Sequence, residues 1–268
     1  MSPAAPQPHL IRLQRYLASC GLGSRRSCEK FITQGRVTID GTVVDQLGAK
    51  VDPQSQQVAL DGENLRMERK KYYIVNKPTG YVSTNRDPQR RPRVIDLFPP
   101  DGPRLFLVGR LDEASEGLLI VTNDGDLAQK LAHPKFRIYR TYQLQVAGHP
   151  SPETLKELKR GIHFAEGRFR VHDVRFLKKQ GRSAFLEAIL TEGQNRELRR
   201  LFARVGHKVL QLKRVAFGPI KLGRLPKGQF RELRRDELAE LIAIVDRNRA
   251  GPAKPGRQNS PDGKKKPR

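Results

Sequence analysis

The sequence lacks the features by which membrane and secreted proteins are usually recognised. Nowhere in its 268 residues does an unbroken apolar run approach the roughly 20 residues that a membrane-spanning helix needs. The opening residues MSPAAPQPHL also lack the apolar core of a secretory signal peptide. We therefore expect a cytoplasmic protein.

Residues that hold metals or form disulfides are scarce. The two cysteines, Cys20 and Cys28, lie eight positions apart in a segment with helical periodicity, and no second pair stands near them. Reduced and buried thiols are expected there rather than a disulfide or a metal site. The six histidines are scattered, so local spacing assembles no metal-ligand cluster.

Motifs for common cofactors are missing as well. The chain has no glycine-rich phosphate loop ending in Lys-Ser or Lys-Thr, and no dinucleotide fingerprint opening a βαβ unit. No glycine-rich strand-to-helix turn stands out in favour of a Rossmann-type methyltransferase, although pattern alone does not exclude that class. We expect a protein that uses no metal and no cofactor.

Acidic residues are too few to balance the basic ones. The chain holds 28 Asp and Glu against 52 Lys and Arg, for a net charge of +24. Such a surface attracts polyanions, so nucleic acid is the expected partner and an anionic membrane the alternative. Residues 247–268 hold eight basic residues and one acidic residue, which leaves +17 on the rest of the chain. The folded part is therefore basic in its own right.

The first part of the chain predicts a small basic domain over residues 10–67, after a disordered Pro/Ala-rich segment at residues 1–9. An apolar helical stripe is formed by Leu10, Leu13, Leu17 and Cys20. Ser24 is placed to cap a second helix. We expect RNA contacts from the basic residues of this second helix and the strand after it, namely Arg25, Arg26, Lys30 and Arg36; a merely solvated face is the alternative.

The stretch LQRYLASCGLGSRRSCEKFITQGRVTIDGTVV resembles the S4 RNA-binding domain, a small module named after a ribosomal protein. The matching features are the first helix, Gly21, the Ser24-Arg25-Arg26 start of the second helix, and Gly35-Arg36-Val37 leading to Asp40-Gly41. The family usually has Asn where Asp40 stands. The resemblance implies an RNA-binding role for this domain.

A second, larger domain is predicted over residues 71–245, followed by a basic disordered tail at residues 246–268. Its pattern of alternating strands and short helices favours an α+β fold, with a mixed, mainly antiparallel sheet and flanking helices. The stretch RLFLVGRLDEASEGLLIVTNDG, residues 104–125, reads as a strand, a glycine-bounded polar loop and a second strand. The loop presents Asp112, either as a turn former or as a rigidly held reactive carboxylate.

A basic helix is predicted over the stretch NRELRRLFARVG. Helical spacing places four arginines on one face, opposite an apolar stripe: Arg196, Arg199, Arg200 and Arg204. Such a face can bind phosphates or pair with a carboxylate, and a solvated face is equally compatible with the pattern. With Asp112 and Tyr142, these arginines are the candidate reactive groups.

The second domain resembles the ribosomal RNA pseudouridine synthases of the RsuA/RluB type. Four stretches carry the resemblance, in the order of that family: NKPTGYVST, GRLDEASEGLLIVTNDG, RTYQLQV and LTEGQNRELRRLF. Ser115 replaces the commoner Thr, and Arg140 stands where many members have Lys. The resemblance spans Leu10 to about Val245 and favours the branch that modifies the large ribosomal subunit.

The resemblance implies isomerisation of uridine to pseudouridine in ribosomal RNA, with 23S RNA as the favoured substrate and Asp112 as nucleophile. Arg199 would pair with Asp112, and Tyr142 would stack on a uracil turned out of its stack. RNA-binding or positioning roles are implied for Lys77, Arg110, Arg140, Arg196 and Arg200. The alternatives are the 16S branch of the family and a non-catalytic assembly factor. We expect a monomer that binds ribosomal RNA or a precursor particle.

Overall fold

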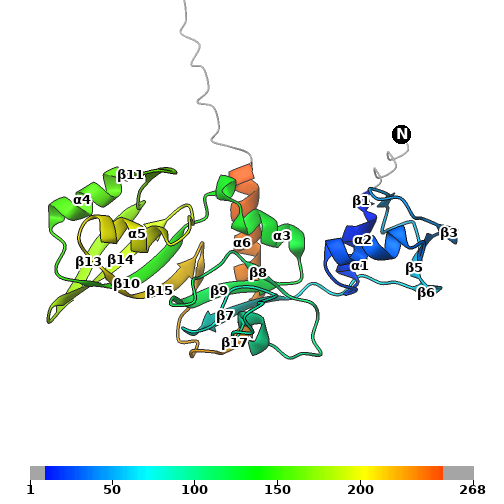
Figure 1. Cartoon of the computed structure of the whole chain (residues 1–268), viewed down its shortest axis with the longest axis horizontal. Coiled ribbons are helices and arrows are strands. Elements are labelled where there is room, and N and C mark those ends of the chain that lie inside the picture. Colours follow the sequence, from blue (N-terminus) through cyan, green and yellow to red (C-terminus); the bar gives the residue numbers. More distant parts are fainter. Residues whose placement is uncertain (1–9, 250–268) are drawn as a thin grey trace, which may run out of the picture.

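The computed structural model describes residues 10–249 and shows a small N-terminal unit beside a larger one (Figure 1). The predicted α+β class is confirmed in both. The predictions of disorder for residues 1–9 and for the tail beyond residue 249 lie outside the described residues. Within the described part, no helix is both long and apolar enough to cross a membrane.

The N-terminal unit packs two helices against short strands. The helices are α1 (Leu13–Ser19) and α2 (Arg25–Thr33). The strands are β1 (Ile11–Arg12), β2 (Val37–Ile39), β3 (Thr42–Val43), β4 (Lys50–Val51), β5 (Val58–Leu60) and β6 (Glu63–Asn64). Strand β1 pairs with β4, and the other four form a sheet in the order β3-β2-β5-β6.

The sequence located the second helix of this unit better than the first. Ser24 caps α2 as predicted, its hydroxyl accepting the Ser27 amide at 3.0 Å. The predicted helix start at Leu10 is wrong, because Ile11 pairs with Val51 in a strand and Leu10 is half exposed. Cys20 and Cys28 carry free thiols.

The larger unit is built on a nine-stranded sheet. Its main path runs β13-β14-β10-β15-β9-β7-β17, with β16 attached to β15 and β8 attached to β9. Only the β15–β9 pair among these is parallel, so the predicted mixed, mainly antiparallel sheet is confirmed. The bounds are β7 (Tyr72–Lys77), β8 (Phe106–Val108), β9 (Glu116–Thr122), β10 (Arg140–Ala147), β13 (Asp173–Gln180), β14 (Ser183–Leu190), β15 (Val209–Phe217), β16 (Ile220–Lys221) and β17 (Phe230–Glu232).

Helices cover this sheet in two groups. Helices α4 (Pro152–Arg160) and α5 (Glu197–Arg204) lie over the β13-β14-β10 half, and α3 (Gly125–Ala132) and α6 (Arg235–Arg249) pack near β9 (Figure 1). The remaining elements are the 3-10 helices η1 (Val94–Leu97) and η2 (Pro134–Phe136) and the hairpin of β11 (Ile162–Phe164) and β12 (Gly167–Phe169).

Two predicted boundaries in this unit need correction. Helix α5 begins at Glu197, because Arg196 adopts a left-handed backbone with φ of 50° and stands just outside the helix. Helix α6 continues to Arg249, so the tail predicted from residue 246 begins too early. The Asn248 amide donates to the Phe136 carbonyl at 2.5 Å, a tertiary contact that a charge-rich composition does not reveal.

Candidate active site

The loop between β8 and β9 is held by hydrogen bonds from several segments of the larger unit. As predicted, its two strands pair, with Val108 opposite Ile120. Every backbone carbonyl from Leu111 to Ser115 accepts a hydrogen bond from a neighbouring group. A turn that only needed to reverse the chain would not require so many partners from distant segments.

Lys77 supports this loop from beneath. Its side chain is completely buried at the end of β7, and its ammonium group donates to the carbonyls of Pro78 at 2.9 Å, Glu113 at 3.2 Å and Ser115 at 2.6 Å. Burial lowers the pKa of Lys77 to about 8, although the nearby carboxylates of Asp112, Glu113 and Glu116 act to raise it. A buried cation thus ties the second half of the loop to the end of β7.

A second tie comes from the segment that follows Lys77. The Ser83 hydroxyl donates to the Leu111 carbonyl at 2.8 Å and accepts the Leu111 amide at 3.1 Å. The Gly80 amide donates to the Glu113 carbonyl at 2.9 Å. Leu111 itself is buried in the apolar core under α5. The loop therefore has one apolar anchor directly before Asp112.

Gly117 lets the neighbouring strand approach the loop. A Cβ at this position would lie 2.2 Å from the Arg214 carbonyl oxygen and 2.7 Å from its amide nitrogen, on the parallel partner β15. The backbone of Gly117 also has φ of 108°, a region that side chains disfavour. Glycine is needed here both for the conformation and for the close contact between β9 and β15.

Asp112, on the loop between β8 and β9, faces two arginines at the protein surface. The distance from its Oδ2 is 3.7 Å to Arg196 Nη1 and 4.0 Å to Arg199 Nε, and the Asp112 side chain is 29% exposed. These separations are those of loose ion pairs rather than of hydrogen bonds. The carboxylate is therefore oriented by charge while remaining open to a bound molecule.

The two arginines differ in how they are held. Arg199 is 13% exposed, and its guanidinium donates to the Val209 carbonyl at 3.1 Å and to the Ala114 carbonyl at 3.0 Å. Arg196 is 53% exposed. Burial, together with the charge of Arg196, lowers the pKa of Arg199, while Asp112 raises it. Arg199 is thus a fixed partner for Asp112, and Arg196 an exposed one.

The buried Nε of Arg199 has no hydrogen-bond partner among the described residues, and it is the atom that faces Asp112. A buried donor without a partner is costly, which favours a closer approach of the two groups. Catalytic contacts are often long in the free enzyme and shorten when substrate binds. The geometry leaves room for that shortening.

Tyr142 lies on β10, opposite Ala188 on β14 and Arg214 on β15. Its side chain is buried in the same apolar cluster as Leu111, the residue before Asp112. The structure thus brings Tyr142 to the core beside the loop. Stacking on a substrate base requires an open ring face, so that role stays a prediction.

Two residues predicted to bind RNA lie inside the protein. Lys77 is fully buried, and Arg140 is buried with its guanidinium donating to the Thr191 carbonyl at 3.0 Å and lying 5.3 Å from the centre of the Phe217 ring. Burial lowers the pKa of Arg140, and the charge of Arg214 adds to this effect. Burial keeps both side chains away from an RNA phosphate in solvent, so a direct RNA contact is not expected of either residue. The positioning role stays a prediction.

The other predicted RNA contacts are spread over both units. Arg25, Arg26 and Lys30 are exposed on α2. Arg110 is exposed on the loop between β8 and β9, called the catalytic loop below because it carries the candidate nucleophile Asp112. Arg36 pairs with Asp61 at 2.5 Å. Arg200 pairs with Glu166 at 2.8 Å and lies over the rings of Phe164 and Phe169, so protein groups already occupy its guanidinium.

Sequence reasoning missed three residues that shape the site: Ser83, Leu111 and Arg214. Ser83 stands within the NKPTGYVST stretch, where a hydroxyl in an otherwise strand-like segment was the available signal. Arg214 is 1% exposed and its Nε donates to the Leu118 carbonyl at 2.6 Å. No local sequence pattern predicts that Arg214 is buried, because its hydrogen-bond partner, Leu118, lies on another strand.

This arrangement suits chemistry that needs one oriented carboxylate, with cations fixed beside it. Such a carboxylate can attack an electrophilic carbon or stabilise positive charge that develops on a sugar. Within residues 10–249, no group of three or more His, Cys, Asp or Glu side chains could hold a metal ion.

Family models agree with this division of the chain. The model for RNA pseudouridylate synthases matches residues 71–204, and the S4 domain model matches residues 11–56. The first match contains both strands of the catalytic loop, Tyr142 and Arg199.

Similar proteins cover almost the whole chain. An uncharacterised RNA pseudouridine synthase of Aquifex aeolicus is 41% identical over 236 residues, 88% of this chain and 95% of that protein. Ribosomal large subunit pseudouridine synthase B of Bacillus subtilis is 38% identical over 237 residues, 88% of this chain and 97% of that protein. A crystal structure of a pseudouridylate synthase superposes with a TM-score of 0.61 at 26% identity, covering 86% of this chain and 99% of that one.

The basic S4 unit, the secured carboxylate loop and these matches agree on one assignment. The chain belongs to the RsuA/RluB-type RNA pseudouridine synthases, enzymes that join an S4 RNA-binding domain to a pseudouridine synthase domain.

Proposed function

We propose that the protein converts one uridine of 23S ribosomal RNA to pseudouridine, with Asp112 as the nucleophile and without a cofactor. One observation carries this proposal. The loop that presents Asp112 to Arg196 and Arg199 is held in place by hydrogen bonds to its backbone carbonyls. A carboxylate held in one orientation lowers the entropy cost of reaching a reactive geometry.

The reaction rearranges bonds within one nucleotide. The N1–C1′ bond of uridine breaks, the uracil turns, C5 joins C1′, and the proton leaves C5 while N1 gains one. The Asp112 carboxylate either forms a transient bond to the nucleotide or balances positive charge at C1′. Either role leaves the carboxylate unchanged at the end, so no outside reactant is needed.

The neighbouring residues have distinct proposed roles. Arg199 orients the Asp112 carboxylate, because protein carbonyls fix the guanidinium of Arg199 beside it. Tyr142 stacks on the turned uracil and assists the proton transfer at C5. The exposed Arg110 and Arg196 contact RNA near the target, and the S4 residues Arg25, Arg26, Lys30 and Arg36 bind a more distant segment.

The choice of the large ribosomal subunit rests on the relatives. The Bacillus subtilis protein, 38% identical along nearly its full length, carries a large-subunit name, and so does a Yersinia pestis protein at 39% identity. We further propose that the enzyme acts in the cytoplasm as a monomer, on ribosomal RNA or on a precursor particle. The domain limits 10–67 and 71–249 serve as working boundaries.

The decisive experiment compares Asp112→Asn with Glu113→Gln, the same chemical change one residue later on the loop. Both purified proteins are incubated with ribosomal RNA from cells that lack the gene, and pseudouridine is mapped at single-nucleotide resolution. Asp112→Asn should bind RNA with unchanged affinity and form no pseudouridine, whereas Glu113→Gln should retain activity. Modification by Asp112→Asn would overturn the nucleophile, and a new site in 16S RNA would overturn the 23S assignment.

The same map separates catalysis from a purely architectural role. If the unaltered protein binds ribosomal RNA and adds no pseudouridine to free RNA or to precursor particles, the remaining explanation is a non-catalytic assembly factor.

A further inference from the structure

We propose that the junction between the S4 unit and the catalytic domain determines which uridine is modified. The junction is defined here as the linker residues 68–71, the end of β9 with the start of α3 at residues 122–126, and Arg15 on α1. It holds the S4 unit at a set position relative to Asp112. The inference rests on the proposed function and adds a specificity element to it.

Strand β9 connects the catalytic loop to the junction. The catalytic loop lies at its start, and Thr122, Asn123 and Asp124 follow at its end. The strand is buried along Gly117–Thr122 and pairs with β7, β8 and β15. A strand spanning Glu116–Thr122 is about 20 Å long and, in the middle of a sheet, stiff. Any group fixed to its far end is therefore fixed relative to Asp112.

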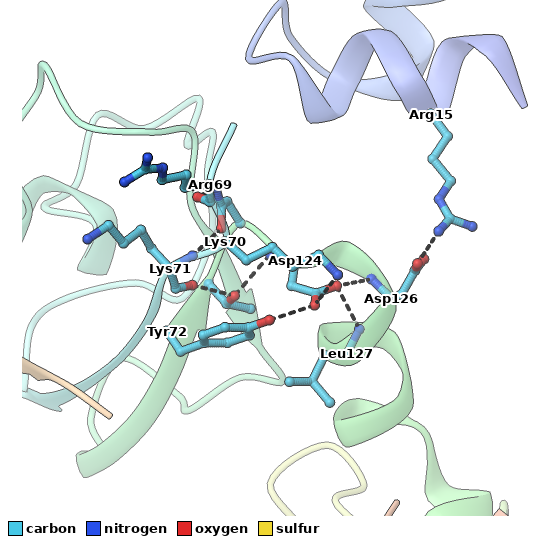
Figure 2. Close-up of polar contacts among 10 residues, drawn as sticks. Arg15, Arg69, Lys70, Lys71, Tyr72, Asp124, Asp126 and Leu127 are labelled. Atoms are coloured by element: carbon cyan, nitrogen blue, oxygen red, sulfur yellow. Dashed lines mark hydrogen bonds and ion pairs between the residues drawn. The ribbon is translucent and has the colours of Figure 1, made fainter. Parts of the chain in front are cut away.

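The far end of β9 holds the interdomain linker by its backbone (Figure 2). Asn123 accepts the Lys71 amide at 2.7 Å through Oδ1 and donates to the Arg69 carbonyl at 3.0 Å through Nδ2. The Thr122 hydroxyl donates to the Lys71 carbonyl at 2.6 Å. These bonds remove most of the freedom expected of a charged, exposed linker.

Asp124 adds a side-chain tie to the same linker. Its buried carboxylate accepts the Lys70 ammonium and the Tyr72 hydroxyl, each at 2.8 Å, and caps α3 by accepting the amides of Asp126 and Leu127 (Figure 2). Burial alone would raise the pKa of Asp124, but the bonds from Lys70, Leu127 and Tyr72 hold it below its ordinary value. The linker and α3 are thereby joined at one residue.

Helix α3 then contacts the S4 unit directly. Arg15 on α1 pairs with Asp126 in the first turn of α3 (Figure 2). Two further links cross the junction: the Arg104 guanidinium donates to the Gly23 carbonyl at 2.9 Å, and the Glu68 amide donates to the Ser19 carbonyl at 2.9 Å. Each connects a stretch of the catalytic domain or linker to the end of α1 or the start of α2.

These polar links matter because none of the four apolar core clusters found among the described residues contains side chains from both units. A cavity of about 540 Å³ lies between them, lined from both sides by residues that include Arg25, Met67 and Phe106. Without a continuous apolar interface, the angle between the units depends on a few hydrogen bonds and ion pairs. Such links are weak one by one, so single substitutions should change the angle without unfolding either unit.

The consequence for site choice is geometric. The exposed cations of α2 hold one RNA segment while Asp112 acts on a nucleotide turned out of its stack. When two binding elements are linked, the effective concentration of the second depends on the allowed span between them. A fixed junction favours the uridine at the matching distance, and a loose junction admits neighbouring uridines.

The test reverses the charges of the pair, using Arg15→Asp, Asp126→Arg and the double exchange in the full-length protein. Arg12→Asp, the same charge change at an exposed side chain on β1, serves as the matched control. Two RNAs are used: a full 23S transcript, and a short hairpin containing the uridine that the unaltered protein modifies. The ratio of modification at that uridine to modification at all others is measured on the transcript, and kcat on the hairpin.

Each single reversal should lower the site ratio by about threefold to tenfold and leave kcat on the hairpin unchanged. It should also speed trypsin cleavage after Arg69 or Lys70, because the linker is released more often. The double exchange should restore both values, and Arg12→Asp should leave both near those of the unaltered protein.

An unchanged site ratio in both single variants would overturn the proposal. A lowered ratio that the double exchange fails to restore would overturn it as well, since the effect would then come from the individual side chains and not from their pairing. Failure of the unaltered protein to modify either RNA, or the same RNA in precursor particles, would instead refute the proposed function, and the two failures are therefore distinguishable.

Discussion

The cations around the catalytic loop and those on α2 carry the same charge but differ in exposure and in what they can bind. Around the loop, the side chains of Lys77 and Arg199 point into the protein and donate hydrogen bonds to backbone carbonyls. On α2, Arg25, Arg26 and Lys30 are exposed. A basic chain therefore contains two populations of cations, one that builds the site and one that is available to RNA.

Burial separates these populations, and composition does not. The net charge of +24 predicts an RNA partner but assigns no single residue to it. A buried cation costs desolvation energy, which carbonyls and carboxylates must offset, and the donors that bind these protein groups are not available to phosphate. The contrast can be tested at both places, and the expected effects decrease from the catalytic loop to α2.

The largest effect is expected from Arg199→Gln. This change removes the fixed charge beside Asp112 and should lower kcat by about a hundredfold to a thousandfold. The measurement is single-turnover pseudouridine formation at saturating enzyme, with circular dichroism to check the fold. Arg204→Gln, at the exposed end of the same helix, is the control. A loss of less than threefold in Arg199→Gln would show that Arg196 alone is sufficient.

Gly117→Ala should reduce the free energy of unfolding by about 3 kcal/mol, because the new Cβ would overlap the backbone of Arg214 and the residue would keep a positive φ. Gly109→Ala is the matched comparison, since Gly109 has φ of 70° and open space around its Cβ position. It should cost about 1 kcal/mol. Equal losses in urea denaturation would show that backbone strain alone accounts for both.

Lys77→Met should reduce the free energy of unfolding by about 2 kcal/mol, because carbonyls of the catalytic loop lose their donor. It should also lower kcat, since the loop would no longer hold Asp112 in place. Denaturation and single-turnover rates at neutral pH measure the two effects. Loss of stability with full activity would mean that the loop keeps its shape without Lys77.

The pH dependence of Lys77 has a defined sign. Its pKa is about 8 in the folded protein and near 10.5 when unfolded, so between these values the unfolded chain binds more protons. The contribution of this group to stability therefore rises with pH over that range. The difference in unfolding free energy between the unaltered protein and Lys77→Met should shift in favour of the unaltered protein from pH 8 to pH 10. If the difference in unfolding free energy stayed constant from pH 8 to pH 10, the pKa of Lys77 in the folded protein would not be about 8.

The smallest effect is expected on α2. Replacing Arg25, Arg26 and Lys30 together by Gln should weaken binding to ribosomal RNA about tenfold and make the salt dependence shallower by about two to three phosphate contacts. The rate at saturating RNA should not change, because these residues lie away from Asp112. Arg36→Gln, whose partner is Asp61, should have a smaller effect on binding. Equal affinity at every salt concentration would assign RNA binding to other cations.

Local features of this protein could be determined from the sequence alone. Ser24 caps the helix that the sequence placed after it, because capping is a contact over three residues. The paired strands on either side of Asp112 follow from two apolar runs and two glycines. The family followed from motifs in a fixed order, and those same motifs pointed to Asp112 and Arg199.

Only the tertiary structure decided where the cations go. Lys77, Arg140 and Arg214 are buried because strands distant in sequence bring carbonyls or an aromatic ring to them. A sequence pattern over a few residues cannot predict such partners, because they come from distant parts of the chain. The same holds for Asp126, whose position at a helix start is local but whose pairing with Arg15 depends on how two separately folded units meet.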